Sequence, residues 1–284
     1  SSGLHYLQEK QTTQDSTNEP LLEARNLSKI FITPSSLFKG KQSFTAVKGV
    51  NFTVQRGETV GIVGESGSGK STIGRMILGL EDITEGSVIY RGKDLKLITD
   101  RTERRAHCLS MQCIFQDPYS SLNPRMSAGE NITYGLKIHN LIDKNKAKTL
   151  AQDLMSLVGL KREDADKLPH AFSGGERQRI GIARALGYRP DFIFCDEPTS
   201  ALDVSVQANL LNLLKDLQEQ FSLTLLFVSH DLAVIRQMCD RVIVMKDGEA
   251  LENGSNENIF EQPKHAYTRS LLDAMPKFQG LAQS

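Results

Sequence analysis

The sequence has no excess of charge of either sign and no long apolar run. Lysine plus arginine and aspartate plus glutamate each number 34 among the 284 residues, so the formal net charge is zero. A balanced chain has no global field that would draw it to nucleic acid or to an acidic membrane surface. No apolar run approaches the roughly 20 residues that cross a bilayer, so we expect no transmembrane helix.

Cysteine is sparse, and its spacing excludes a metal-binding framework. The chain has four cysteines, none of them in a CxxC pair, and we expect free thiols in a reducing compartment. Residues 1–20 are poor in apolar side chains and rich in Gln, Thr, Ser, Glu and Asn. We interpret this segment as a disordered polar tail, either an expression scar or a piece of a longer chain, and exclude it from the fold.

From Leu21 onward, short apolar runs alternate with longer amphipathic stretches, which is typical of an α/β protein. The near-continuous hydrophobicity of the short runs predicts a parallel sheet covered on both faces. Residues 246–249 predict a hairpin turn and a small antiparallel edge. Apolar residues recur at helical spacing between about 117 and 172, which indicates a helical insertion with Gly159 as a stop. The predicted strands are 59–63, 192–195, 225–228 and 242–245.

A phosphate-binding loop follows the first predicted core strand and precedes a helix predicted over 73–80. The pattern G-x-x-x-x-G-K-S turns backbone N–H groups toward phosphate oxygens at a helix N-terminus. Lys70 is expected to reach the terminal phosphates and Ser71 to bind Mg²⁺. The predicted nucleotide-binding residues of this segment are Gly64, Glu65, Ser66, Gly67, Ser68, Gly69, Lys70, Ser71 and Thr72.

Two carboxylates follow the apolar strand predicted over 192–195. An α/β sheet presents its reactive groups at the carboxyl ends of its strands. We therefore expect Asp196 to hold Mg²⁺ and Glu197 to activate the attacking water as general base. Alone, this pair is also compatible with a solvated turn, but together with the loop at Lys70 it predicts an NTPase.

A second glycine-rich helix start lies at 173–178, with the sequence SGGERQ after Phe172. It resembles the LSGGQ signature of ABC ATPases. Ser173, Gly174 and Gly175 open a helix predicted over 177–186 and offer a second anion-binding N-terminus, which we expect to face the ATP of a partner. By itself, the segment could be a capped, glycine-rich turn.

Three further motifs follow in the order of that family. Gln116 resembles the Q-loop, residues 200–203 the D-loop, and His230 the switch histidine. The resemblance implies that Gln116 touches Mg²⁺ or the lytic water, that His230 contacts the γ-phosphate, and that Asp203 communicates across a dimer. Taken singly, the three could be a strand-end cap, a loop histidine and a helix N-cap.

The base of the nucleotide needs a platform, and an aromatic ring can provide one. Phe31 stands where ABC ATPases carry their adenine-stacking aromatic residue. Two alternatives stay open: Phe31 could be a core aromatic of the first strand, and Phe44 could take its place, since we expect a loop over residues 32–45.

Two segments resemble the oligopeptide, dipeptide and nickel importer branch of the family: residues 115–125 and the tail at 259–272. That branch usually has the sequence His-Pro-Tyr-Thr at the position of residues 265–268, where this chain has Ala266 in place of the proline. Some of its members carry a cysteine-rich extension, but no cysteine follows Cys239, so no iron–sulfur cluster is expected. The resemblance implies a P-loop NTPase with a RecA-like core sheet, an antiparallel β edge subdomain and an inserted helical subdomain. The expected division is an ATPase domain over 21–260 and an importer-type tail over 261–284.

The implied function is that of an ATP-hydrolysing subunit that energises peptide uptake at the cytoplasmic face of a bacterial inner or plasma membrane. Expected partners are two permease subunits, a second ATPase subunit (an identical copy or a paralogue) and, indirectly, an extracytoplasmic binding protein. No nucleic-acid partner is expected. Nickel or metal-chelate import is the first alternative. A non-transport ABC ATPase acting on ribosomes or DNA is the second, although the chain has neither heptads nor a strong basic patch.

Overall fold

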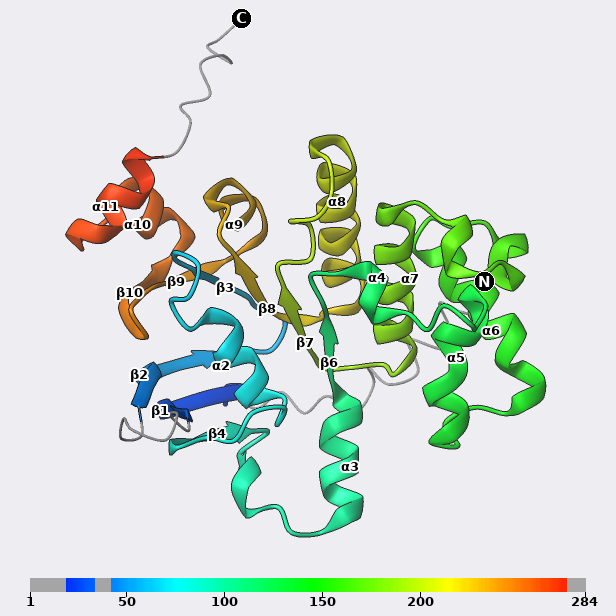
Figure 1. The fold of residues 1–284 in the computed structure, drawn as a ribbon, viewed down its shortest axis with the longest axis horizontal. Helices are drawn as coiled ribbons and strands as arrows, with labels where there is room; N and C mark the ends of the chain where they lie inside the picture. Colours follow the sequence, from blue (N-terminus) through cyan, green and yellow to red (C-terminus); the bar gives the residue numbers. More distant parts are fainter. Residues whose placement is uncertain (1–18, 34–41, 275–284) are drawn as a thin grey trace, which may run out of the picture.

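The computed structural model describes residues 19–33 and 42–274. Most of the polar tail predicted over 1–20, and residues 275–284 of the predicted C-terminal tail, therefore lie outside the described residues. An antiparallel sheet, a larger central sheet and a block of helices lie side by side (Figure 1). None of the described helices is long and apolar enough to span a bilayer.

The central sheet has the order β10-β9-β3-β8-β7-β6, and only β10 runs antiparallel to its neighbour. Every residue of β3, β7 and β8 is buried, as expected for parallel strands with both faces covered. The predicted hairpin turn is confirmed, because Asp247 and Gly248 take positive φ between β9 and β10. The strands are β3 (Thr59–Val63), β6 (Met111–Ile114), β7 (Phe192–Asp196), β8 (Thr224–Ser229), β9 (Arg241–Lys246) and β10 (Glu249–Ser255).

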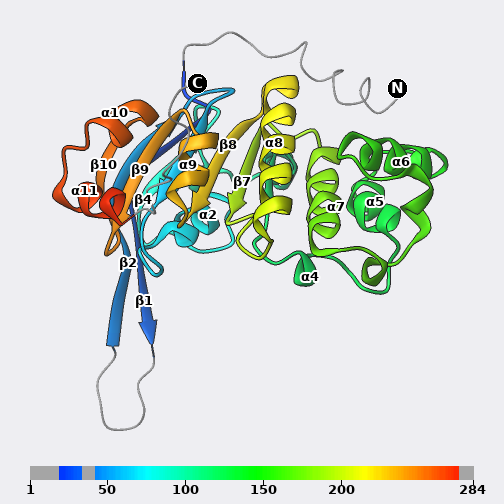
Figure 2. The ribbon, with the colours of Figure 1, turned by 90° about the horizontal axis from the view of Figure 1, so that it is seen from above.

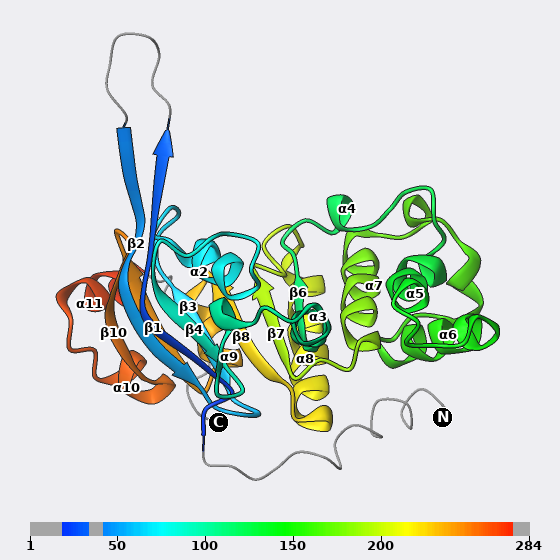
Figure 3. The ribbon, with the colours of Figure 1, turned by 90° about the horizontal axis from the view of Figure 1, so that it is seen from below.

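The second sheet is antiparallel and has the order β2-β1-β4-β5. Its two longest strands project well beyond the rest of the molecule (Figures 2 and 3). The loop predicted over 32–45 is wrong at both ends, because β1 continues to Thr33 and β2 begins at Gln42, with Phe31 directly opposite Phe44. The strands are β1 (Leu22–Thr33), β2 (Gln42–Val54), β4 (Glu85–Tyr90) and β5 (Lys93–Asp94).

Helices cover both faces of the central sheet. The helix predicted over 73–80 begins and ends about three residues earlier, as α2. Gly69, at φ +97°, lets the loop turn directly into the helix, and Gly79, at φ +70°, stops it. The helices outside the insertion are α2 (Lys70–Ile77), the 3₁₀ turn η2 (Leu95–Leu97), α3 (Arg101–Ser110), α8 (Val204–Phe221), α9 (Leu232–Met238), α10 (Asn256–Glu261) and α11 (Ala266–Asp273).

The segment after β6 is helical, and α5, α6 and α7 pack together at one end of the molecule (Figure 2). Ser127 and Glu130 form a capping box at the start of α5. Gly159, at φ +78°, follows α6 as the predicted stop. The elements are α4 (Pro118–Ser121), α5 (Ala128–Ile138), η3 (Lys144–Lys146), α6 (Ala147–Leu157), η4 (Arg162–Asp166), η5 (Pro169–Ala171) and α7 (Gly174–Gly187).

Two hydrophobic clusters lie on opposite faces of the central sheet. Along β7, Phe192 and Phe194 enter the cluster shared with α2 and the antiparallel sheet. Ile193 and Cys195 enter the other cluster, which contains residues of α8, α9 and the helical insertion. Alternate side chains of one strand thus bind the two layers together. Asp196 is the last residue of this strand.

Candidate nucleotide-binding site

The loop between β3 and α2 is folded around the ammonium group of its own lysine. Lys70 Nζ donates hydrogen bonds to the carbonyl oxygens of Gly64 and Glu65, at 2.8 and 2.7 Å. Burial lowers the pKa of Lys70, and the nearby Glu197 and Asp196 carboxylates oppose this shift. A charged donor held at the start of a helix, where backbone N–H groups are free, suits an anionic ligand.

Close packing explains two glycines of this loop. A Cβ atom on Gly64 would lie 2.2 Å from the carbonyl oxygen of Met245, and one on Gly69 would lie 2.4 Å from that of Ala46. Both contacts are with backbone, which cannot move aside as a side chain can. The loop is therefore wedged between β2 and β9, and only glycine fits at these positions.

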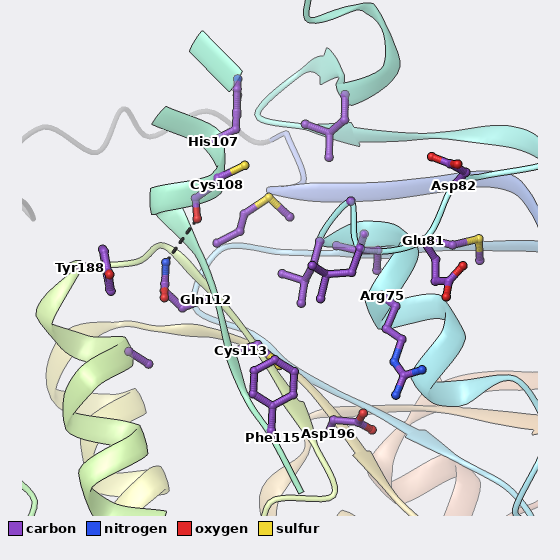
Figure 4. Close-up of a pocket in the computed structure, with 18 of the residues that line it drawn as sticks. Arg75, Glu81, Asp82, His107, Cys108, Gln112, Cys113, Phe115, Tyr188 and Asp196 are labelled. Atoms are coloured by element: carbon purple, nitrogen blue, oxygen red, sulfur yellow. Dashed lines mark hydrogen bonds between the residues drawn. The ribbon is translucent and has the colours of Figure 1, made fainter. Parts of the chain in front are cut away.

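Ser71 and Asp196 meet at the first turn of α2. The Ser71 hydroxyl donates to Asp196 Oδ1 at 2.6 Å, across 125 positions of sequence. Asp196 is 8% exposed. Burial raises the pKa of its carboxyl group, while the Ser71 hydrogen bond and the Arg75 guanidinium counter the increase; Figure 4 shows Arg75 pointing toward Asp196. A hydroxyl and one carboxylate are the kind of protein ligands that a Mg²⁺ ion also bound to phosphates requires.

Glu197 and His230 form the second functional pair. Glu197 follows β7 at φ +47°, and its N–H donates to the carbonyl of Val228, which turns the side chain away from the strand. Glu197 Oε2 lies 3.0 Å from His230 Nδ1. The Glu197 side chain is 17% exposed and that of His230 59%. A partly exposed carboxylate beside Lys70 and Asp196 can accept a proton from water.

Gln116 is exposed and lies two residues beyond β6. It lines a cleft of about 1290 Å³ together with Asp196, Arg75 and Phe115. Figure 4 shows the end of α2 on one side of this cleft and α3, β6 and Tyr188 around the rest. The structure thus brings Gln116 to the same edge of the sheet as the Ser71–Asp196 pair.

The start of α7 is built by a capping box. Ser173 Oγ accepts from the N–H of Glu176, whose carboxylate accepts from the N–H of Ser173. Gly174 and Gly175 form the first turn, and a Cβ atom on Gly175 would lie 2.3 Å from Val206 Cγ1. The signature therefore packs against the beginning of α8.

Asp203 is exposed and is the N-cap of α8, accepting from the N–H of Val206. This is the simpler of the two interpretations of Asp203, and it is compatible with a second role at a dimer surface. Figures 2 and 3 place α7 well away from α2, with the strands of the central sheet between them. Within one chain, the signature segment and the P-loop do not meet.

Phe31 is half-buried and packs against the hydrophobic cluster next to α2. Lys29 Nζ lies 4.8 Å from the centroid of its ring. Phe44 is 59% exposed and, as the directly opposed residue of β2, lies on the same face of the sheet. Both aromatic candidates therefore remain available for the base.

Sequence reasoning missed Gln178 and Arg75. Gln178 is 2% exposed, and its amide donates to the carbonyl of Phe115 at 2.9 Å, which ties α7 to the segment that carries Gln116. The available signal was a lone polar residue on the apolar face of the signature helix, in register with Ile182 and Ala185. Arg75, an exposed arginine in a helix, gave no comparable signal.

A sequence model described as ABC transporter matches residues 47–200, more than half of the chain. The chain belongs to the ABC transporter family. The oligopeptide transport ATP-binding protein OppF of Bacillus subtilis is 46% identical over 259 residues, which cover 91% of this chain and 83% of OppF.

Solved structures agree with this membership of the ABC transporter family. CbiO1 of Clostridium perfringens, part of the transporter complex cbiONQ, has a TM-score of 0.73 and 25% identity, over 86% of this chain and 92% of that one. The dimeric ATP-binding cassette MJ0796, in a post-hydrolysis state with ADP and phosphate, has a TM-score of 0.71 and 31% identity, over 83% of this chain and 98% of that one. The predicted fold class and ATPase class are confirmed.

Proposed function

We propose that this ABC cassette binds MgATP at Lys70 and Ser71, hydrolyses it with Glu197 as general base, and thereby energises uptake of oligopeptides or dipeptides. The observation that carries the proposal is the pair of contacts at the edge of the sheet, Ser71–Asp196 and Glu197–His230. Both pairs include a carboxylate near the lysine of the P-loop, which supports roles as a metal ligand and as a base.

Each group has a definite task in this scheme. Lys70 exchanges its two loop carbonyls for phosphate oxygens, so the loop is shaped before the substrate arrives. Ser71 and Asp196, with Gln116, would hold Mg²⁺, which supplies positive charge at the phosphates when bound. Glu197 takes a proton from water, and His230 contacts the γ-phosphate. Phe31 stacks on the adenine.

The other half of the site comes from a second cassette. The signature turn at Ser173 is exposed and lies far from the P-loop of its own chain, so its free N–H groups have no phosphate within the protomer. We infer that it faces the nucleotide of a partner cassette, with Asp203 at the same interface. The dimeric MJ0796 structures support this arrangement.

The cleft beside Gln116 is the proposed docking site for the permease subunits, at the cytoplasmic face of the membrane. Its rim carries two exposed apolar side chains, Leu80 at 61% and Phe115 at 42%. An apolar rim around charged walls fits an amphipathic segment of a partner. The proposal of a peptide cargo rests on the name of the relative OppF and on the resemblance of the tail at 259–272 to the importer branch.

The test is reconstitution. The chain is placed in proteoliposomes with a second cassette, two permease subunits and a peptide-binding protein from the same organism. We expect peptide-stimulated phosphate release and uptake of labelled peptide that both require Mg²⁺. Stimulation of phosphate release by nickel complexes, without any response to peptides, would contradict the proposed peptide cargo. A purified chain that releases no phosphate in any combination would contradict the proposed ATP hydrolysis.

A further inference from the structure

The segment between β6 and α5 carries Gln116 and is held in place by another element, the signature helix α7. The short helix of this segment, α4, packs against α7 (Figures 2 and 3). Three side chains of α7, at positions 177, 178 and 184, contact the segment. Each of them meets a different residue within 115–121, so the whole stretch around Gln116 lies along one helix.

The first contact is made by Gln178 and fixes the peptide group to which Gln116 belongs. Gln178 is buried, and its Nε2 donates to the carbonyl oxygen of Phe115 at 2.9 Å. That carbonyl and the backbone nitrogen of Gln116 form one planar peptide group. A hydrogen bond to the oxygen therefore sets the plane from which the Gln116 side chain starts.

The other two contacts hold α4, which follows Gln116 directly. The Arg177 guanidinium lies over the Tyr119 ring, with Cζ 3.9 Å from the ring centroid. Arg184 donates to the carbonyl oxygen of Ser121. The chain is thus attached to α7 both before and after Gln116.

One helix therefore connects two functional segments. Ser173 is the N-cap of α7, and Gln178 follows about 7.5 Å further along the helix axis. The turn at Ser173 is proposed to hold the nucleotide of a partner cassette, whereas Gln116 is proposed to reach Mg²⁺ in its own chain. A movement of α7 should carry the peptide group of Gln116 with it, because a buried amide that loses its partner is strongly destabilising.

We propose that Gln178 is a positioning residue for Gln116, which attaches a metal ligand of this cassette to the helix that meets the partner's nucleotide. The inference rests on the proposed function, in which Gln116 helps to hold Mg²⁺. Gln178 acts in this scheme only through the orientation of Gln116. A purely structural glutamine would stabilise the fold without any effect on the response to Mg²⁺.

The experiment compares Gln178→Leu with Gln218→Leu, which removes a similar amide from another part of the protein. Gln218 Nε2 donates to the carbonyl oxygen of Gly57 at 2.6 Å. This contact lies near the starts of β3 and β8, at the opposite edge of the sheet from Asp196. Leucine keeps the approximate size of glutamine in both variants. A lower melting temperature is expected in both, because each leaves a backbone carbonyl without its donor.

The full chain is titrated with a fluorescent, non-hydrolysable ATP analogue, once with Mg²⁺ and once with EDTA. In Gln178→Leu, the dissociation constant with Mg²⁺ should rise about threefold to tenfold, the loss expected for one hydrogen bond. The dissociation constant with EDTA should stay unchanged. In Gln218→Leu, the ratio of the two constants should equal that of the parent chain.

A double-mutant cycle with Gln116→Ala tests the route of the effect. If Gln178 acts through Gln116, Gln178→Leu should add nothing to the effect of Gln116→Ala on the constant with Mg²⁺. Tyr119→Ser changes a ring that is 65% exposed, so it loosens α4 without disturbing the core. It should raise the same constant, and it keeps the proposal testable if Gln178→Leu does not fold.

Two results would overturn the proposal and leave the nucleotide site intact. One is a ratio of the two constants that is the same in the parent chain as in Gln178→Leu, or as in Tyr119→Ser if the first variant does not fold. The other is strict additivity of Gln178→Leu and Gln116→Ala. If Gln116→Ala leaves the response to Mg²⁺ unchanged, the proposed metal role of Gln116 fails together with this inference. If the parent chain does not bind the analogue at all, the proposed nucleotide site fails as well.

Discussion

The Glu197 carboxylate lies 3.0 Å from Nδ1 of His230. The proposed base and the proposed phosphate-contacting histidine therefore form one hydrogen-bonded unit across the ends of β7 and β8. The carboxylate fixes the orientation of the ring, and the ring orients the carboxylate. Either side chain can be changed without disturbing the buried strands that carry the pair.

Glu197→Gln should retain ATP binding and lose turnover. The amide keeps the shape of the side chain but cannot accept a proton, so kcat should fall at least about 100-fold. With ATP, the variant should accumulate as a closed dimer in size-exclusion chromatography. Phosphate release measures the loss, and Glu219→Gln, an exposed position on α8, is the control. Undiminished turnover in Glu197→Gln would assign the base to another group.

Asp196→Asn should stabilise the nucleotide-free protein while it abolishes Mg²⁺-dependent hydrolysis. The pKa of Asp196 is raised above its ordinary value of 3.8, so the folded state binds a proton here more readily than the unfolded state. Asp196 therefore favours the folded state at low pH, where its carboxyl group is protonated. This stabilisation is lost as pH rises through the folded-state pKa. At pH 7.5, we expect the neutral amide to add about 1 kcal/mol, or about 2–4 °C in melting temperature.

The pH profile separates this effect from a general one. The difference in stability between Asp196→Asn and the parent chain should shrink as pH falls toward 3.8, because Asp196 of the parent chain then becomes neutral as well. Thermal melts at several pH values measure it. A stability difference that does not change with pH would show that the charge of Asp196 is not its cause.

Gly175→Ala should reduce ATPase activity more than it reduces stability. The new methyl group would lie 2.3 Å from Val206 Cγ1, and a valine cannot rotate away easily, so the start of α8 and its cap Asp203 must move. Gly181→Ala on the same helix is the matched control, because no atom lies within 4 Å of its added Cβ. Alanine there should stabilise α7 by about 0.5–1 kcal/mol. Equal activity in the two variants would remove the role of the Gly175–Val206 contact.

Gly74→Ala should destabilise the protein by about 2–3 kcal/mol, the upper part of the range for an overpacked core. A Cβ atom at Gly74 would lie 1.9 Å from the Phe194 ring, where α2 packs on β7. The double variant Gly74→Ala/Phe194→Leu gives the methyl group room, so its melting temperature should exceed the value expected from adding the two single changes. Strict additivity would mean that the helix avoids the ring by moving as a whole.

Contiguous motifs made much of the candidate site predictable. The loop ending in Lys70 and the strand ending in Asp196 each carry their structural context in the neighbouring residues. The contacts between them were harder to predict, because Gln178 meets Phe115 across 63 positions. A single sequence does not encode such a contact in a local pattern.

The same limit applies to the fold. Strand 59–63 was predicted to the residue, since a short apolar run between polar neighbours has clear ends. Both ends of the loop predicted over 32–45 were wrong, because β1 extends past Ser28, where its pairing with β4 ends, and continues to pair with β2. Pairing rather than composition decides how far such strands extend. The glycine at position 79, which stops α2, was a signal that the prediction overlooked.

The helical insertion shares its hydrophobic cluster with β7, β8 and α8. Because the apolar contacts continue from the insertion into the sheet, we expect the two regions to unfold together. Buried amides of α5 and of β8 should therefore exchange with solvent in the same cooperative event. A force that a partner applies to the insertion should therefore reach the ends of the strands that carry Glu197 and His230, because continuous apolar packing joins the two regions.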